Sequence, residues 1–217
     1  MVMVKTDALK VLHADDALLV LEKPAGLLSV PGRGEDKQDC LSARIQSIYA
    51  DALIVHRLDM ATSGLMLMAR GKTVQRILSQ AFADRQVDKK YVALVQGALT
   101  QKVAPWSTID LPIAVDWPNR PRRVIEPLTG KPSVTRWRVL ASADLQHTRV
   151  ELEPVTGRSH QLRVHMRAIG HPIMGDALYA ADAALVTHSR MLLHATEIRF
   201  VHPVSNQKMH FVSLPDF

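Results

Sequence analysis

Residues 53–68 read LIVHRLDMATSGLMLM, in which two apolar runs flank one short polar turn. Short apolar runs on both sides of a turn that contains Gly64 are typical of two buried strands. Asp59 places a carboxylate within this turn, two residues after Arg57. Such a carboxylate either hydrogen-bonds its own loop, as Asp often does in turns, or is kept ionised for chemistry. The residues around the turn leave both interpretations open.

Further strands are expected on both sides of this turn, because short apolar or alternating segments recur along the chain. They are predicted at 11–13, 18–21, 91–95, 134–140, 148–152, 191–200 and 209–212. The proline-rich part between residues 98 and 135 also holds apolar residues, so we expect extended segments and turns there.

Three helices are predicted between these strands. Asp39 is expected to cap a helix over 41–49, and Ser159 is expected to cap a helix over 160–169. Amphipathic spacing predicts another helix over 73–86. Many strands and few helices in no repeating order predict an α+β fold on a mixed or antiparallel sheet.

Length and composition set bounds on the class of protein. The chain has 217 residues and is 47% hydrophobic, which is enough for one large domain or two small lobes. Cys40 is the only cysteine, so no internal disulfide is possible, as in proteins of a reducing compartment. The first residues hold no long apolar run, and we expect a cytoplasmic protein that does not bind membranes. The net charge of +6 suits a polyanionic partner, although many basic proteins bind none.

The segment 156–167 is dense in basic side chains. In a helix, Arg163 and Arg167 would share one face, and like charges at this spacing are unfavourable without an anionic partner. One interpretation is a solvated basic face, and the other is an arginine that reaches a buried carboxylate while its neighbours contact phosphates. His160 and His165 are five residues apart, which is the wrong spacing for a metal pair on one helix face, so we expect no metal site.

Two further segments suit RNA. Lys89 and Lys90 precede Tyr91, whose ring could stack on a base, although a tyrosine at the start of an apolar strand is usually part of the core. Between residues 116 and 138, the basic side chains outnumber the acidic ones, with Trp117 and Trp137 interleaved. This pattern is typical of a nucleic-acid surface, and a solvated rim is the alternative. The basic residues there are Arg120, Arg122, Arg123, Lys131, Arg136 and Arg138.

Several common catalytic motifs are missing. Gly32-Arg33-Gly34 lacks the third glycine of a dinucleotide-binding turn, and Gly130-Lys131 runs into a proline rather than completing a phosphate loop. The chain also has no Gly-x-Ser-x-Gly elbow of the kind that carries a nucleophilic serine.

Together these segments resemble the RluA-type family of RNA pseudouridine synthases, from about residue 14 to the end and in the family's order. The similar segments are HRLD at 56–59 with TSGL at 62–65, KY at 90–91, GRSHQLR at 157–163, LLHA at 192–195 and KPAGL at 23–27. The resemblance implies an α+β fold, with a mainly antiparallel sheet and flanking helices around a central cleft. DWPNRP at 116–121 is similar to the short members, so residues 1–217 are expected to form a single catalytic domain of two lobes without an S4-like N-terminal domain.

The resemblance also implies a reaction and its residues. The family isomerises uridine to pseudouridine in RNA and uses no cofactor or metal. Asp59 would be the essential carboxylate, Arg163 would pair with it, and Tyr91 would stack on the uracil and could transfer a proton. Leu193, and more weakly Leu192, would form the wall of the base pocket.

The remaining site residues are assigned by resemblance to RNA. Arg57 would fill the space that a flipped uridine leaves. The side chains expected to contact the RNA beside it are His56, Lys89, Lys90, Arg120, Arg122, Arg123 and Arg158. The implied partners are an rRNA hairpin and a tRNA anticodon stem-loop, bound by a monomer. The alternatives are a non-catalytic RNA-binding protein on the same scaffold, a carboxylate-using hydrolase or nuclease, and a basic structural protein of the ribosome.

Overall fold

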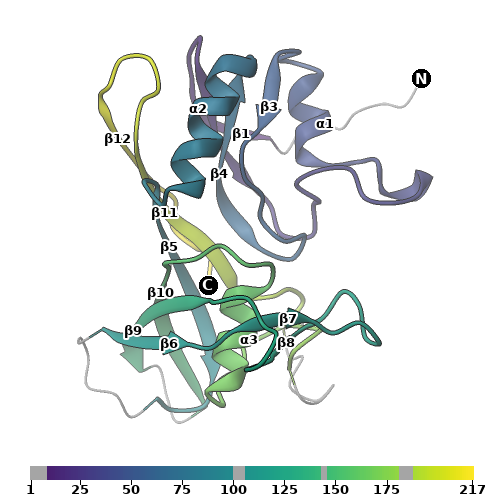
Figure 1. Cartoon of the computed structure of the whole chain (residues 1–217), viewed down its shortest axis with the longest axis vertical. Helices are drawn as coiled ribbons and strands as arrows, with labels where there is room; N and C mark the ends of the chain where they lie inside the picture. Colours follow the sequence, from purple (N-terminus) through teal and green to yellow (C-terminus); the bar gives the residue numbers. More distant parts are fainter. Residues whose placement is uncertain (1–8, 100–105, 143–145, 181–187) are drawn as a thin grey trace. The chain divides into compact units, whose positions relative to one another are not determined.

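The computed structural model describes residues 9–99, 106–142, 146–180 and 188–217 (Figure 1). The chain divides into two compact units. Unit 1 holds the chain up to Lys89 together with Ala195–Pro215, and unit 2 holds Lys90–His194 together with Asp216–Phe217. The chain therefore passes from unit 1 into unit 2 within one strand, β5 (Asp88–Gln96), and returns within another, β11 (Leu193–Val201).

In unit 1, the strands follow the order β1-β2-β4-β11, with β3 paired to β4 and β12 paired to β11. The strand bounds are β1 Lys10–Ala14, β2 Leu18–Lys23, β3 Ala52–Ile54, β4 Ser63–Arg70 and β12 Lys208–Val212. Asp15 forms the turn between β1 and β2, because its Oδ1 accepts the backbone N–H groups of Ala17 and Leu18 at 2.8 Å each. The two apolar runs around Asp59 are thus β3 and β4, as the sequence predicts.

Strand β4 is buried on both faces, and its alternating side chains serve two separate cores. Leu65 and Leu67 pack with Leu78 of helix α2 (Lys72–Ala83), whereas Met66 and Met68 pack with Ile45 of helix α1 (Leu41–Gln46). Successive residues of a strand point to opposite faces, so the two helices cover opposite faces of the unit 1 sheet. Such two-sided burial explains why this segment is continuously apolar rather than alternating.

The caps of two helices differ from their predictions. Helix α1 is capped by Cys40, whose Sγ accepts the N–H of Ala43, and Asp39 instead binds Arg44 through two hydrogen bonds. Helix α3 (Gln161–Ala168) begins after His160, which has a left-handed backbone with φ of 58° and makes no side-chain cap. In both places the residue after the predicted one takes the cap position.

In unit 2, the strands follow the antiparallel order β5-β10-β9-β6, and β7 pairs with β8 as a separate hairpin. Their bounds are β6 Ser107–Asp110, β7 Ile113–Val115, β8 Arg123–Ile125, β9 Val134–Ser142 and β10 His147–Pro154. Val164 of α3 packs against Ile113 of the hairpin and against Tyr179. The predicted α+β fold is confirmed, with few helices beside mostly antiparallel strands.

Candidate active site

Asp59 lies half-buried in unit 1, on the loop that joins β3 to β4. Its neighbour Leu58 is held from both sides by Ser29, whose hydroxyl donates to the Leu58 carbonyl at 2.7 Å and accepts the Leu58 N–H at 3.1 Å. On the other side, Thr62 donates its N–H to the backbone carbonyl of Asp59 at 3.1 Å. The backbone around Asp59 is therefore fixed, and its side chain is aimed by a loop that has little freedom to move.

Lys23 supports the same loop from the end of β2. Its side chain is completely shielded, and its Nζ donates to the carbonyls of Pro24 at 2.8 Å, Leu27 at 2.7 Å and Met60 at 3.0 Å. Burial lowers the Lys23 pKa to about 8, and the negative charge of Asp59 acts in the opposite direction. Sequence reasoning assigned Lys23 to a family-like loop without a role, and only its contacts show that it supports the Asp59 loop.

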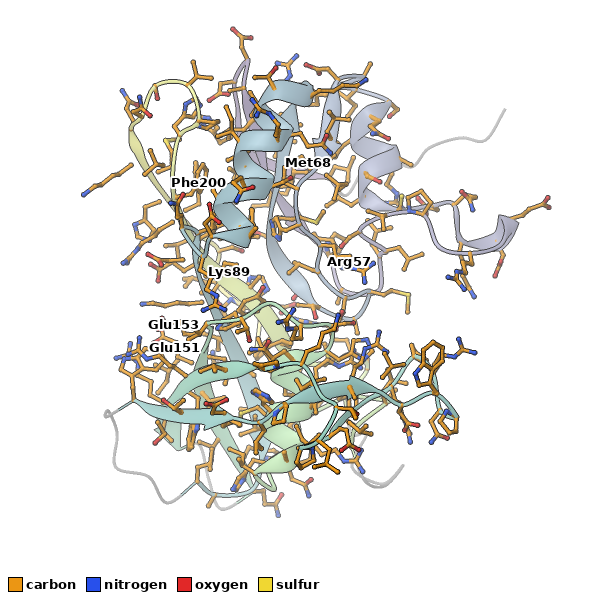
Figure 2. All side chains as sticks on the ribbon, viewed as in Figure 1. Arg57, Met68, Lys89, Glu151, Glu153 and Phe200 are labelled. Carbon is orange, nitrogen blue, oxygen red and sulfur yellow. The ribbon has the colours of Figure 1, made fainter. Side chains whose placement is uncertain are left out.

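His56 and Arg57 precede Asp59 and have different environments. The His56 ring stacks on Phe82 with 4.4 Å between ring centres, and its Nε2 accepts the N–H of Leu67 at 2.9 Å. Burial, and then the charge of Lys89, lower the His56 pKa to about 3, so the ring is neutral. Arg57 is exposed. Figure 2 labels it on the loop that joins β3 to β4. The described contacts of His56 are internal, whereas the position of Arg57 allows contact with a large ligand.

Tyr91 and the two leucines of the expected base pocket belong to unit 2 and share one backbone scaffold. Tyr91 lies on β5, where Leu94 donates its N–H to the Leu192 carbonyl at 3.1 Å. Met174 bridges the same two segments, donating to the Leu94 carbonyl and accepting from the Leu192 N–H at 2.9 Å each. Leu192 and Leu193 are both buried. Unit 2 therefore brings β5, residue 174 and the start of β11 together.

Arg163 has a described partner that sequence reasoning missed. It forms two hydrogen bonds with Asp176, from Nε to Oδ2 and from Nη2 to Oδ1, each 2.7 Å long. Both side chains are buried. Asp176 of unit 2 is therefore a buried carboxylate of the kind expected for an arginine of this segment. Arg167, on the next turn, is exposed, so the two arginines do not share one environment.

The basic middle region separates into two groups. Arg120 lies exposed near the tip of the β7–β8 hairpin, with its guanidinium 4.8 Å from the ring centre of Trp117, which is itself 68% exposed. Arg122 and Arg123 are half-buried in the same hairpin. The other candidate from the third motif, Arg158, is exposed and donates from its Nε to the Pro132 carbonyl at 3.3 Å.

The second group is neutralised by acids that the sequence pattern did not place beside it. Arg136 and Arg138 of β9 pair with Glu153 and Glu151 of β10 at 3.1 Å and 2.6 Å; Figure 2 labels both acids. Lys90 also pairs with Glu151, at 3.7 Å. The interpretation of residues 116–138 as one basic surface was therefore too broad.

Two other members of the RNA-binding interpretation are largely withdrawn from solvent. Trp137, between the paired arginines of β9, is only 8% exposed and belongs to the core. Lys89 lies with its Nζ 5.3 Å from the ring centre of Phe82, and burial lowers its pKa. An RNA contact by Lys89 stays a prediction.

The predicted site residues are thus divided between the two units. Unit 1 carries Asp59 with His56, Arg57 and Lys89, and unit 2 carries the rest. The expected pair of Asp59 and Arg163 would join the two units and stays a prediction.

Within the described ranges, no group of three or more His, Cys, Asp or Glu side chains is arranged to hold a metal ion. The helices formed by the described residues are all too short or too polar to cross a membrane.

Residues 17–168 match the family model for RNA pseudouridylate synthases. The chain is 45% identical to the dual-specificity RNA pseudouridine synthase RluA of Yersinia pestis over 207 residues, which are 95% of this chain and 99% of that protein. It is 46% identical to the protein of the same name from Escherichia coli (strain K12) over 209 residues, which are 96% of this chain and 94% of that one.

Two solved structures of similar fold come from human proteins. Human RNA pseudouridylate synthase domain containing 1 is similar with a TM-score of 0.79 and 28% identity, covering 100% of this chain and 87% of that one. Human RNA pseudouridylate synthase domain containing 4 is similar with a TM-score of 0.77 and 25% identity, covering 95% and 89% of the two chains.

Proposed function

The chain belongs to the RNA pseudouridylate synthase family, and from this premise we propose that it modifies uridines in two structured RNAs, a large-subunit rRNA hairpin and a tRNA anticodon stem-loop. It is an isomerase that converts uridine to pseudouridine. The single observation that carries the two-substrate proposal is the identity of 45% to 46%, over nearly the whole chain, to synthases that are named dual-specificity. The alternative of a non-catalytic RNA-binding protein gains no support from these relatives.

The reaction rearranges one nucleoside without a second reactant. The bond between N1 of uracil and C1′ of ribose breaks, the base turns, and a new bond forms between C5 and C1′. The hydrogen of C5 leaves as a proton, and N1 takes up a proton, so atoms and electrons balance. A protein that catalyses this must hold the detached base, stabilise charge at C1′ and move one proton.

Asp59 is proposed as the group that acts at C1′, either as a nucleophile or by stabilising positive charge there. Its loop is held by Ser29 and Lys23, so the carboxylate is preorganised, which is the main source of electrostatic catalysis in enzymes. The Lys23 ammonium also interacts electrostatically with Asp59 within unit 1.

Unit 2 is proposed to hold the base and to complete the site. Tyr91 would stack on the uracil and take part in proton transfer, and Leu193 with Leu192 would form the apolar wall beside it. Arg163 is proposed to pair with Asp59, as the family resemblance implies.

A uridine inside a helix must leave its stack before the chemistry starts. Extrusion costs about a few kcal/mol, and less in a loop. Arg57 is proposed to occupy the vacated space, which agrees with its exposure on the loop that carries Asp59. Arg120, Arg122, Arg123 and Arg158 are proposed to follow the RNA backbone around it. Contacts of Lys89, Lys90 and His56 with RNA stay predictions, because these side chains already have partners within the protein.

The substitution Asp59→Asn tests the assignment of the essential carboxylate. The variant should bind RNA as the wild-type protein does and form no pseudouridine, measured as tritium release from RNA labelled at C5 of uridine. The matched control is Asp51→Asn, which removes an exposed carboxylate of unit 1 that pairs with Arg70. Appreciable pseudouridine formation by the Asp59→Asn variant would overturn the assignment.

The substrates are tested by mapping pseudouridines in the rRNA and tRNA of a strain that lacks this protein. Loss of one site in each RNA class, restored by the wild-type gene, is the expected result. Loss in only one class would contradict dual specificity without touching the isomerase activity. The single cysteine suits a reducing compartment, and we further infer that the protein works as a monomer in the cytoplasm.

A further inference from the structure

Arg163 is held by Asp176 in a geometry that leaves it little freedom. The side chains are 6% and 0% exposed, and two parallel hydrogen bonds of 2.7 Å join them. A bidentate pair of this kind fixes the plane of the guanidinium as well as its position. Asp176 therefore sets the direction in which the other N–H groups of Arg163 point.

Asp176 is itself immobilised by a tight turn. Its Oδ1 accepts the N–H of Leu178 at 3.0 Å, and its backbone carbonyl accepts the N–H of Ala180 at 3.0 Å. Gly175 before it has φ of +71°, and a Cβ there would lie 2.0 Å from the Arg190 carbonyl. This turn follows directly on Met174, which is bonded to the scaffold of β5 and Leu192, so the direction of Arg163 is tied to the scaffold of Tyr91.

Tyr179 links Arg163 to a second element. The guanidinium lies 5.0 Å from the centre of the Tyr179 ring, which is 2% exposed. The Tyr179 hydroxyl accepts the backbone N–H of Arg123 at 2.7 Å and is hydrogen-bonded to Nδ1 of His160 at 2.7 Å. Arg123 opens β8, so one side chain contacts the arginine and anchors the hairpin.

We propose, resting on the proposed function, that Asp176 and Tyr179 are positioning residues of the isomerisation. Asp176 orients Arg163 for the reaction, and Tyr179 fixes the β7–β8 hairpin relative to Arg163 so that RNA bound by the hairpin is in register with the site. Both residues act through other groups. Asp176 affects the chemical step, whereas the Tyr179 hydroxyl affects the binding of RNA.

The proposal predicts that one conservative variant changes kcat alone and that another changes KM alone. Asp176→Asn keeps the shape of the side chain but loses the negative charge and the bidentate pair with Arg163. Because small misplacements of reacting groups cost about this much, kcat should fall by roughly 100-fold, with KM within about twofold of the wild-type value. Tyr179→Phe keeps the ring against Arg163 and loses the hydroxyl, so KM should rise by about fivefold, the effect of one ordinary hydrogen bond, with kcat nearly unchanged. Both constants come from tritium release on one RNA transcript that the wild-type protein modifies.

Unit 1 offers a matched control trio. Arg70 pairs with Asp51 at 3.2 Å and lies 5.4 Å from the ring centre of Tyr49, the same chemistry at a surface position outside the proposed site. Asp51→Asn and Tyr49→Phe should leave both kcat and KM unchanged.

A double-mutant cycle separates positioning from a general loss of structure. If Asp176 acts through Arg163, then Asp176→Asn should cost less than about twofold in kcat when Arg163→Lys is already present. Thermal unfolding followed by circular dichroism shows whether each variant is folded at the assay temperature. If Asp176→Asn does not fold, Asp176→Glu keeps the charge, displaces the arginine and should lower kcat by more than about tenfold.

Several outcomes would overturn the proposal. Effects of Asp176→Asn and Arg163→Lys that multiply would show that Asp176 acts independently of Arg163. A wild-type kcat in a folded Asp176→Glu variant, or a wild-type KM in Tyr179→Phe, would remove the corresponding role. A wild-type protein that modifies no RNA would overturn the proposed function itself, and the positioning roles with it.

Discussion

Arg57 and Asp59 are two residues apart on one loop, yet one is exposed and the other is half-buried. The loop can therefore present a long cation to the RNA while its short carboxylate stays half-buried. This difference in exposure supports separate tasks for the two residues, opening the RNA and changing the base.

Arg57→Ala should lower turnover on a paired uridine by at least about tenfold, because extrusion costs a few kcal/mol, and should affect an unpaired uridine less. The fold should stay intact, with the free energy of unfolding changed by no more than about 0.5 kcal/mol, as is usual at exposed positions. Arg76→Ala, which removes an exposed arginine of α2, is the control for the loss of one charge. Equal turnover in wild type and Arg57→Ala on both RNAs would remove the proposed role.

The low pKa of His56 predicts that the folded protein becomes less stable in acid. Its pKa falls from 6.5 in the unfolded chain to about 3 in the fold, so below pH 6.5 only the unfolded chain takes up the proton. Stability is therefore lost as the pH falls from about 6.5 towards 3, by about 2 kcal/mol between pH 7 and pH 5 for this residue.

The test is urea unfolding of the wild type and of His56→Gln at pH 7 and pH 5. The variant, which can still accept the Leu67 N–H, should lose less stability over this interval. Part of the dependence should remain, because burial also lowers the pKa of His165. Identical losses in the two proteins would show that His56 is not the acid-sensitive group.

At the scale of the element, β4 connects the Asp59 loop to the rest of unit 1. Helix α2 packs against one face of β4 and helix α1 against the other, and the first residues of β4 lie close to β11. Gly64 allows this approach: it has φ of +111°, and a Cβ there would lie 2.3 Å from the carbonyl oxygen of Ala195.

Gly64→Ala should therefore destabilise the protein by about 3 kcal/mol or more, because backbone strain and a backbone clash act together. Gly26→Ala is the matched control, with φ of +85° but no atom within 4 Å of the added Cβ. It should cost only about 1 kcal/mol, the price of the left-handed backbone alone. Chemical denaturation measures both values, and equal costs would contradict the role of the close approach.

At the scale of the whole molecule, the basic side chains behind the net charge of +6 are not equally available to RNA. Arg120 is exposed beside Trp117 and is available to phosphates, whereas Arg136 is already paired with Glu153. A cation that is already paired with an acid of the protein releases fewer counterions from RNA than one without such a partner. The number of basic residues therefore overstates the number of phosphate contacts that the protein can make.

Arg120→Gln should weaken RNA binding and reduce the slope of log K against log salt by roughly 0.7–0.9, the value for one lost phosphate contact. Arg136→Gln removes the same formal charge and should change the slope much less. Binding titrations of both variants at several salt concentrations check this, and equal slopes would contradict the division of the basic region.

The sequence alone determined the α+β class, the two strands around Asp59 and the family to which the chain belongs, because local periodicity and ordered motifs are properties of neighbouring residues. Only the tertiary structure decided which groups pair: Arg163 with Asp176, Arg136 and Arg138 with acids of β10, and Cys40 rather than Asp39 at the cap of α1. The pairing of charges depends on distances between residues far apart in the chain, and a pattern of residue types contains no such distances. The loop that displays Asp59 could thus be read from its sequence, whereas the lysine that supports it and the acid that orients Arg163 could be recognised only from their contacts.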